Sequence, residues 1–224
     1  MSMLSNLELI RRVPLFALLT ANQAESVADA VAKRRFKRGE VVVEQGEKSN
    51  TLFIILTGRV RVVTSDKRGR EVILATLNPG DYIGEMSLID NEPHSATVRA
   101  EVQTDMLALG RTEFARCLPE NSSMAYAIMK GLVQRLRQAD RKIESLALMD
   151  VYGRVARALL EFGQPDRDGN TTIRERISRQ DIAKMVGASR EMVSRVMKDL
   201  EDRGFIETRE DGSMLIKDRL STLG

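Results

Sequence analysis

An apolar repeat in the second half of the chain limits the folds that it can adopt. Apolar residues recur there at alternating spacings of four and three, at Ala125, Met129, Leu132, Leu136, Ala139, Ile143 and Leu146. This spacing places them all on one narrow stripe of a single long helix. So narrow a stripe suits a partner helix better than a broad globular core, and we expect a parallel homodimer joined through residues 119–149. A helix packed on its own domain is the alternative.

The residues before this helix have the pattern of a small β-structure. Residues 4–32 read as helices, broken near Pro14 and restarted near Thr20. Short β-branched runs then follow, and glycines separate them. The runs cover 41–43, 52–56, 60–63, 72–77, 96–98 and 106–109, and the glycines are Gly39, Gly46, Gly58, Gly69, Gly80 and Gly84. Many short strands with glycine turns are typical of a barrel or sandwich.

The residues after the long helix begin a second domain. Residues 151–162 predict another helix, which ends at Gly163 and Pro165. The stretch from Gly163 to Thr171 is rich in Asp, Gly and Pro and predicts a surface loop. We therefore expect one domain over 1–150, including the dimerisation helix, and another over 151–224.

Residues 177–206 have the pattern of two short capped helices around one turn. Ser178 and Ser189 are expected to cap the helices, and Gly187 permits the turn between them. The expected buried faces are Ile182, Ala183, Val186, Val193, Val196, Met197 and Leu200. Two short strands around a turn follow in residues 205–217, which completes a winged helix-turn-helix.

The exposed side of this element has the chemistry of DNA recognition. Arg190, Glu191 and Arg195 stand at the front of the second helix, where an Arg fork matches guanine and a carboxylate accepts from cytosine. Arg179, Gln180 and Ser189 are expected to contact phosphates. Residues 174–198 carry seven Lys and Arg against three Asp and Glu, an excess of four positive charges. A helical subdomain with merely solvated charges is the alternative.

Composition excludes several other classes of function. The single cysteine, Cys117, and the single histidine, His94, leave no internal disulfide, iron–sulfur cluster or histidine metal site. No constellation of nucleophile and base is evident, so we do not expect an enzyme. No apolar run is long enough for a bilayer and no signal peptide opens the chain, so the expected location is cytoplasmic, away from the membrane.

These features together resemble the CRP/FNR family of bacterial transcription regulators over essentially the whole chain. Residues 189–195, S-R-E-M-V-S-R, are similar to the recognition-helix motif of that family, and residues 80–85, G-D-Y-I-G-E, match its glycine pattern. The resemblance implies an α+β fold: a double-stranded β-helix (jelly-roll) that binds cyclic nucleotides, a long dimerisation helix and a winged helix-turn-helix. It further implies a palindromic DNA site of the TGTGA type and RNA polymerase as a partner.

The resemblance also implies an effector pocket. Its residues would be Gly84, Glu85, Met86, Ser87, His94, Ser95, Ala139 and Asp140. Gly84 would let the backbone approach the nucleotide, Glu85 would accept from the ribose 2′-hydroxyl, and Ser95 would donate to the cyclic phosphate.

This chain departs from the family pattern at two places. His94 stands where cyclic-AMP-binding members have an arginine for the phosphate, so the bidentate fork is missing. Ala139 and Asp140 replace the Thr-Ser pair that contacts adenine. An ionised carboxylate only accepts hydrogen bonds, and guanine presents two adjacent donors, so Asp140 favours a guanine nucleotide, with Arg137 or Arg141 on its O6 and N7.

The effector is thus left open among cyclic AMP, cyclic GMP and cyclic di-GMP, with no metal required. Three other readings also remain open. The first is a regulator that binds DNA without a nucleotide or senses another small molecule. The second is a haem sensor that rests on His94 alone, and the third is an enzyme or the regulatory subunit of one.

Overall fold

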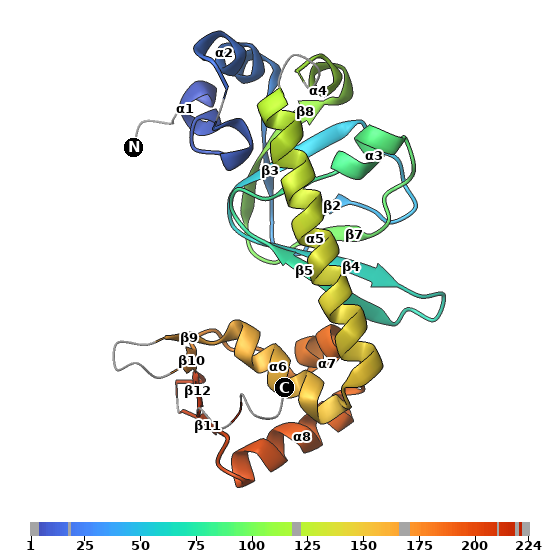
Figure 1. The fold of residues 1–224 in the computed structure, drawn as a ribbon, viewed down its shortest axis with the longest axis vertical. Coiled ribbons are helices and arrows are strands. Elements are labelled where there is room, and N and C mark those ends of the chain that lie inside the picture. The colour runs from blue at the N-terminus through green and yellow to red at the C-terminus, as the bar shows by residue number, and fades with distance from the viewer. Residues whose placement is uncertain are drawn as a thin grey trace. The chain divides into compact units, whose positions relative to one another are not determined.

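A computed structural model describes residues 5–17, 19–117, 122–165, 171–209, 211–217 and 220 of the chain. The chain forms two compact units, Met1–Leu136 and Arg137–Gly224. The long helix α5 (Ser122–Leu148) contains the division between them (Figure 1). Among the described residues, no helix is both long and apolar enough to cross a membrane.

The first unit begins with short helices. α1 (Asn6–Ile10) is capped by Ser5 and α2 (Ala21–Ala30) by Thr20, each in a reciprocal capping box. The 3₁₀ helix η1 (Pro14–Phe16) lies between them. The predicted break near Pro14 and the predicted restart near Thr20 are therefore confirmed.

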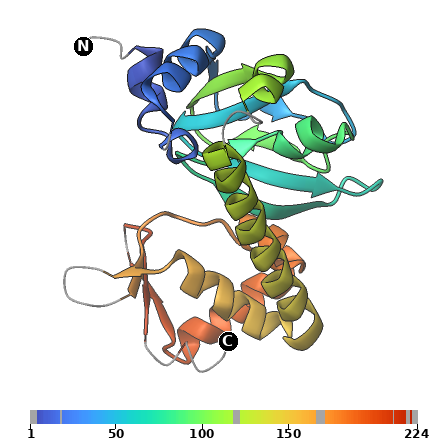
Figure 2. The same cartoon turned by 45° about the horizontal axis from the view of Figure 1, so that its top comes forward.

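Two four-stranded antiparallel sheets make up the β-roll of the first unit (Figures 1 and 2). Their orders are β1-β8-β3-β6 and β2-β7-β4-β5. The strands are β1 (Ala32–Phe36), β2 (Val41–Val43), β3 (Thr51–Thr57), β4 (Val60–Ser65), β5 (Glu71–Leu77), β6 (Tyr82–Ile83), β7 (Thr97–Ala100) and β8 (Thr104–Gly110). Ile55 and Met106 of one sheet share a buried cluster with Val60 and Val98 of the other, so the sheets pack face to face.

Two further helices and the start of α5 complete this unit. α3 (Glu85–Asp90) follows β6, and α4 (Arg111–Cys117) follows β8. Met124 and Ile128 bury one side of α5 in the core of the β-roll. The Tyr82 hydroxyl donates to the Ile128 carbonyl at 3.0 Å, and a Cβ on Gly131 would lie 2.0 Å from the same hydroxyl. A glycine, unfavourable within a helix, is therefore required where Tyr82 meets α5.

The apolar repeat of α5 divides between two faces. Met129, Leu136 and Ile143 are 56%, 62% and 64% exposed and form a stripe seven residues apart. Leu132, predicted to lie on this stripe, instead packs partly against the core of its own unit. Val133 is exposed in its place. The helix must cover the β-roll with one face, and that requirement turns Leu132 inward.

The second unit is a winged helix-turn-helix. Its helices are α6 (Val151–Phe162), α7 (Arg179–Val186) and α8 (Arg190–Asp202). Its strands β9 (Gln164–Pro165), β10 (Thr171–Ile173), β11 (Ile206–Thr208) and β12 (Met214–Ile216) form one antiparallel sheet in the order β11-β12-β10-β9.

The predicted architecture is confirmed in this unit with one correction. The predicted loop over residues 163–171 is shorter than expected, because Gln164 and Pro165 form the short strand β9 and Thr171 begins β10, with which β9 pairs. Residues 166–170, the rest of that expected loop, lie outside the described residues. The hairpin of β11 and β12 is the wing, and Asp211, at its turn, accepts from the backbone and hydroxyl of Ser213.

Candidate nucleic-acid interface and effector pocket

The two helices of the helix-turn-helix begin and turn as the sequence predicts. The Ser178 hydroxyl accepts from the Asp181 N–H at 3.0 Å, and the Ser189 hydroxyl accepts from the Met192 N–H at 3.2 Å. Gly187 caps α7 in the left-handed conformation with φ of 65°. All the apolar residues predicted to face inward are buried, namely Ile182, Ala183, Val186, Val193, Val196, Met197 and Leu200.

This packing leaves the polar face of α8 open. The side chains of Arg190, Glu191 and Arg195 are exposed. Within the described part of the chain, none of the three forms an ion pair or a side-chain hydrogen bond. They therefore remain available for base edges, whose donors and acceptors match guanidinium and carboxylate groups.

The residues proposed for phosphate contact have different surroundings. Gln180 is exposed, whereas Arg179 is half-buried and lies 3.7 Å from a carboxylate oxygen of Glu201. The same carboxylate accepts from Thr208 at 2.6 Å, so Arg179 also links α7 to α8 and to the wing. The Ser189 hydroxyl is the cap of α8, and its proton can still be donated to a phosphate.

Substituting Arg195 with alanine tests base reading. We expect a loss of about 1–3 kcal/mol in discrimination between the preferred base pair and its replacements, because the bidentate contact would be lost. Binding titrations of the full chain against single-base variants of a TGTGA palindrome measure this quantity. Gln180→Ala is the matched control, and it should weaken binding to all DNA sequences alike. Equal losses on every sequence for Arg195→Ala would show that Arg195 does not read a base.

The predicted effector pocket of the first unit centres on a glycine turn. Gly84 has a φ of 93°, and a Cβ there would lie 2.5 Å from the Thr51 carbonyl oxygen. Only glycine fits this close approach in the left-handed conformation. Glu85 follows at once and opens α3, with its side chain only 2% exposed.

The buried carboxylate of Glu85 already has a partner that the sequence did not indicate. Arg135 of α5 donates from one terminal guanidinium nitrogen to Glu85 and from the other to the Tyr82 carbonyl, and its guanidinium lies 4.9 Å from the centre of the Tyr82 ring. Burial raises the pKa of Glu85, and the charge of Arg135 opposes that rise. The pair ties the first half of α5 to the pocket.

His94 is held from both sides. His94 is 8% exposed, with its Nδ1 3.2 Å from the Ser87 hydroxyl and its Nε2 2.8 Å from the Ser49 hydroxyl. Burial lowers the pKa of His94 below its usual 6.5, so the ring is neutral at pH 7. A neutral imidazole has one donor and one acceptor, and both are already used.

The predicted pocket residues thus divide into three groups. Gly84, Glu85, Ser87 and His94 come together as buried residues of the first unit. Met86 and Ser95 belong to the same unit but are exposed. Ala139 and Asp140 are exposed on α5. In the described part of the chain, no three His, Cys, Asp or Glu side chains gather to hold a metal ion.

A β-roll with a buried cluster of polar side chains at the predicted effector site, followed by a winged helix-turn-helix, defines a class of DNA-binding proteins with a sensory domain. Comparison with known families agrees with this class. Residues 33–121 match the model of the cyclic nucleotide-binding domain, and residues 153–220 match the model of the Crp-like helix-turn-helix domain.

Individual relatives cover most of the chain. It is 37% identical to the cAMP-activated global transcriptional regulator Vfr of Pseudomonas aeruginosa, over 79% of this chain and 86% of that protein. It is 35% identical to the cAMP-activated global transcriptional regulator CRP of Salmonella typhimurium, over 77% of this chain and 83% of that protein. The solved structure of the c-di-GMP responsive global regulator CLP from Xanthomonas campestris superposes with a TM-score of 0.76 at 26% identity, covering 88% of this chain and 98% of that one.

The chain therefore belongs to the CRP/FNR family. It is a DNA-binding transcription regulator with a cyclic nucleotide-binding domain. Its relatives are transcription regulators and not enzymes, which argues against the hypothesis that the chain is an enzyme or the regulatory subunit of one. The comparisons also support a dimer.

Proposed function

We propose that this regulator binds a palindromic TGTGA-type operator as a homodimer joined through α5, and that a guanine-containing cyclic nucleotide controls its affinity for DNA. Arg190, Glu191 and Arg195 read the bases, and Arg179, Gln180 and Ser189 contact phosphates. RNA polymerase is the partner through which the bound dimer acts on transcription.

The observation that carries the allosteric part is the ion pair between Glu85 and Arg135. A ribose 2′-hydroxyl that donates to Glu85 engages the same buried carboxylate that holds Arg135 of α5. A ligand in the pocket thereby acts directly on a contact that docks the proposed dimerisation helix. Ligand binding therefore changes how strongly Glu85 holds Arg135 of the helix. Allostery requires a differential interaction of this kind.

The remaining pocket residues fit a nucleotide in part. Gly84 lets the protein backbone approach the ligand closely, and the exposed Ser95 supplies a hydroxyl donor for the phosphate. His94 supplies no charge, because it is neutral and both ring nitrogens are engaged. Ligand selectivity therefore depends more on the base than in a pocket with an arginine fork.

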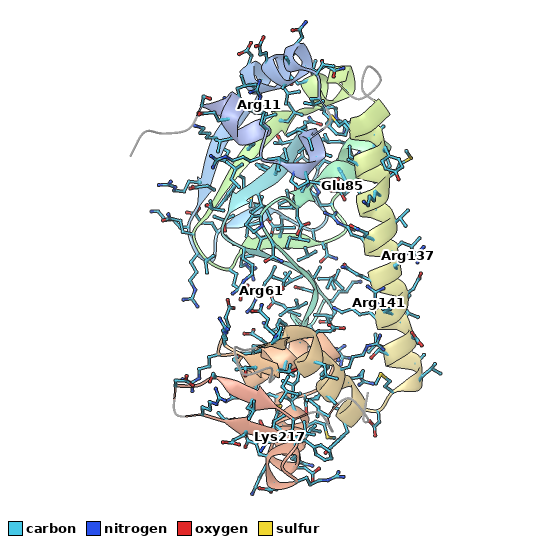
Figure 3. The ribbon with its side chains drawn as sticks, turned by 60° about the vertical axis from the view of Figure 1, so that its left-hand side comes forward. Arg11, Arg61, Glu85, Arg137, Arg141 and Lys217 are labelled. Atoms are coloured by element: carbon cyan, nitrogen blue, oxygen red, sulfur yellow. The ribbon has the colours of Figure 1, made fainter. Side chains whose placement is uncertain are left out.

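Asp140 supports guanine as that base. It lies on the exposed stripe of α5, four residues after Leu136 and three before Ile143. In a parallel pair of helices, the two copies of such a residue approach each other, and like charges repel there. Two adjacent donors on guanine satisfy a carboxylate in this position, and the exposed Arg137 and Arg141 of α5 (Figure 3) can meet the O6 and N7 acceptors.

One observation favours a second candidate function, a regulator that binds DNA without a nucleotide or senses a different small molecule. Glu85 and His94, the two polar groups that a cyclic nucleotide would meet deepest in the pocket, are both satisfied within the chain. A pocket of this kind is stable without a ligand.

Calorimetry of the full chain against cyclic AMP, cyclic GMP and cyclic di-GMP separates these functions, when paired with DNA titrations on a TGTGA palindrome. We expect a guanine nucleotide to bind most tightly and to change the affinity for DNA. Tightest binding of cyclic AMP overturns the choice of base. DNA binding that is tight and unaffected by all three nucleotides supports the second candidate instead.

A further inference from the structure

The junction between α5 and α6 is held by one arginine. Only Met149 and Asp150 separate the two helices, and Arg154 lies in the first turn of α6. Its Nη1 donates to the Met149 carbonyl at 2.8 Å, and its Nε donates to the Val186 carbonyl at 2.9 Å. One guanidinium thus connects the segment that ends α5 to the segment that ends α7.

The second of these carbonyls lies next to the DNA-reading helix. Val186 is the last residue of α7, where helix carbonyls lack intrahelical partners and carry partial negative charge. A cation is favoured at that end. Gly187 then makes the turn, and Ser189 caps α8. Arg154 therefore contacts the turn from which α8 starts.

Other contacts of the second unit converge on the same junction. A Cβ on Gly187 would lie 3.6 Å from the Leu146 side chain, so the last turns of α5 reach the turn before α8. The Met149 sulfur accepts from the Ser145 hydroxyl at 3.4 Å and lies 3.8 Å from Arg157 Nη1. Arg154 differs from Arg157 in that it reaches both the junction and α7.

We propose that Arg154 is a positioning residue that fixes α8 relative to the end of α5 and thereby sets the half-site spacing that the dimer accepts. The inference rests on the proposed dimer through α5. In such a dimer, the two copies of α8 must enter the major groove about one helical turn, roughly 34–36 Å, apart. Their separation follows from how each α8 is held on its own copy of α5. A loosened clamp lets α8 adjust, so operators with other spacings become acceptable.

Lysine cannot replace this clamp. The planar guanidinium presents donors in fixed directions and reaches two carbonyls at once, whereas an ammonium is a single flexible point charge. Arg154→Lys keeps the charge and most of the aliphatic stem but loses the bridge. Arg154→Met keeps the stem alone. Arg157→Lys is the matched control, because Arg157 lies on the same helix and touches Met149 without reaching α7.

The test is a set of binding titrations on TGTGA palindromes whose central spacer is lengthened or shortened one base pair at a time. The full chain is titrated without nucleotide, with cyclic AMP and with cyclic di-GMP. We expect the wild type and Arg157→Lys to prefer one spacer sharply. Arg154→Lys should reduce that preference about tenfold, because its affinity for operators with other spacers should rise relative to its affinity for the operator with the best spacer.

Each alternative result is decisive. An equal loss on every spacer for Arg154→Lys and Arg154→Met means that Arg154 only stabilises the fold, and it overturns the inference. If Arg154→Met does not fold, the lysine variant alone decides. A wild type that binds operators of every spacer length equally well overturns the proposed function itself, namely that a dimer recognises the two half-sites of a palindrome. That result is distinguishable from an equal loss of affinity in the Arg154 variants. Sedimentation of each variant confirms that the oligomeric state is unchanged.

Discussion

Replacing Leu136 and Ile143 together with glutamate should convert the protein into a monomer. Both side chains lie on the exposed stripe of α5, and neither belongs to the buried core of its own unit. In a paired helix they would face the partner, so two glutamates per chain would bury four unpaired charges. Sedimentation at micromolar concentration should report monomers, and affinity for the palindrome should fall by orders of magnitude toward that of one half-site.

The matched control is the pair of substitutions Gln134→Glu and Gln138→Glu. Both glutamines are exposed on α5 but lie off the stripe, so the same two charges enter the same helix without reaching the partner. Leu132 is left unchanged, because it packs partly against the β-roll and its substitution would damage the domain. A wild type that is already monomeric at this concentration, or a double variant that still sediments as a dimer, contradicts the proposal.

The helix-turn-helix could be predicted from the sequence because its signals are local. Each cap lies beside the helix that it starts, the turn glycine lies between the helices, and the buried residues recur with the helical period. The long helix, predicted over residues 119–149, is present as Ser122–Leu148. The spacing did not distinguish the face of this helix that covers the β-roll from the face that stays exposed. Met129, Leu136 and Ile143 belong both to the predicted stripe and to the stripe that is exposed in the structure.

The edge of the β-roll was missed for a physical reason. β1 consists largely of charged residues, Lys33, Arg34 and Arg35, and no β-branched run marks it. Among the described strands it pairs only with β8, at the edge of its sheet, where charged side chains discourage pairing with other molecules. A strand of this kind has no hydrophobic periodicity to detect.

The partners within the pocket and the junction depend on long-range contacts. Arg135 is 50 residues away from Glu85, Ser49 is 45 away from His94, and Val186 is 32 away from Arg154. No local spacing relates such pairs, so a single sequence does not reveal them. One member of each of the first two pairs was named from the sequence, Glu85 beside the glycine turn and the single histidine, His94.

The replacement of Asp140 by serine should exchange the preference of the regulator between guanine and adenine nucleotides. Serine both donates and accepts, so it can meet the donor and acceptor that adenine presents side by side. It loses the paired acceptors that suit guanine. We expect binding of cyclic GMP and cyclic di-GMP to weaken by about 1–3 kcal/mol, the range of a good bidentate contact to a base, and binding of cyclic AMP to strengthen.

Calorimetry with the three nucleotides measures both changes on one protein. Glu144→Ser is the matched control, because it removes an exposed carboxylate from the same helix one turn further on and should leave the nucleotide preference unchanged. The serine variant should also dimerise more tightly without ligand, since it removes two like charges from the facing stripes. If the unaltered chain binds cyclic AMP more tightly than both guanine nucleotides, Asp140 does not select the base, and its carboxylate serves only the solvated surface of α5.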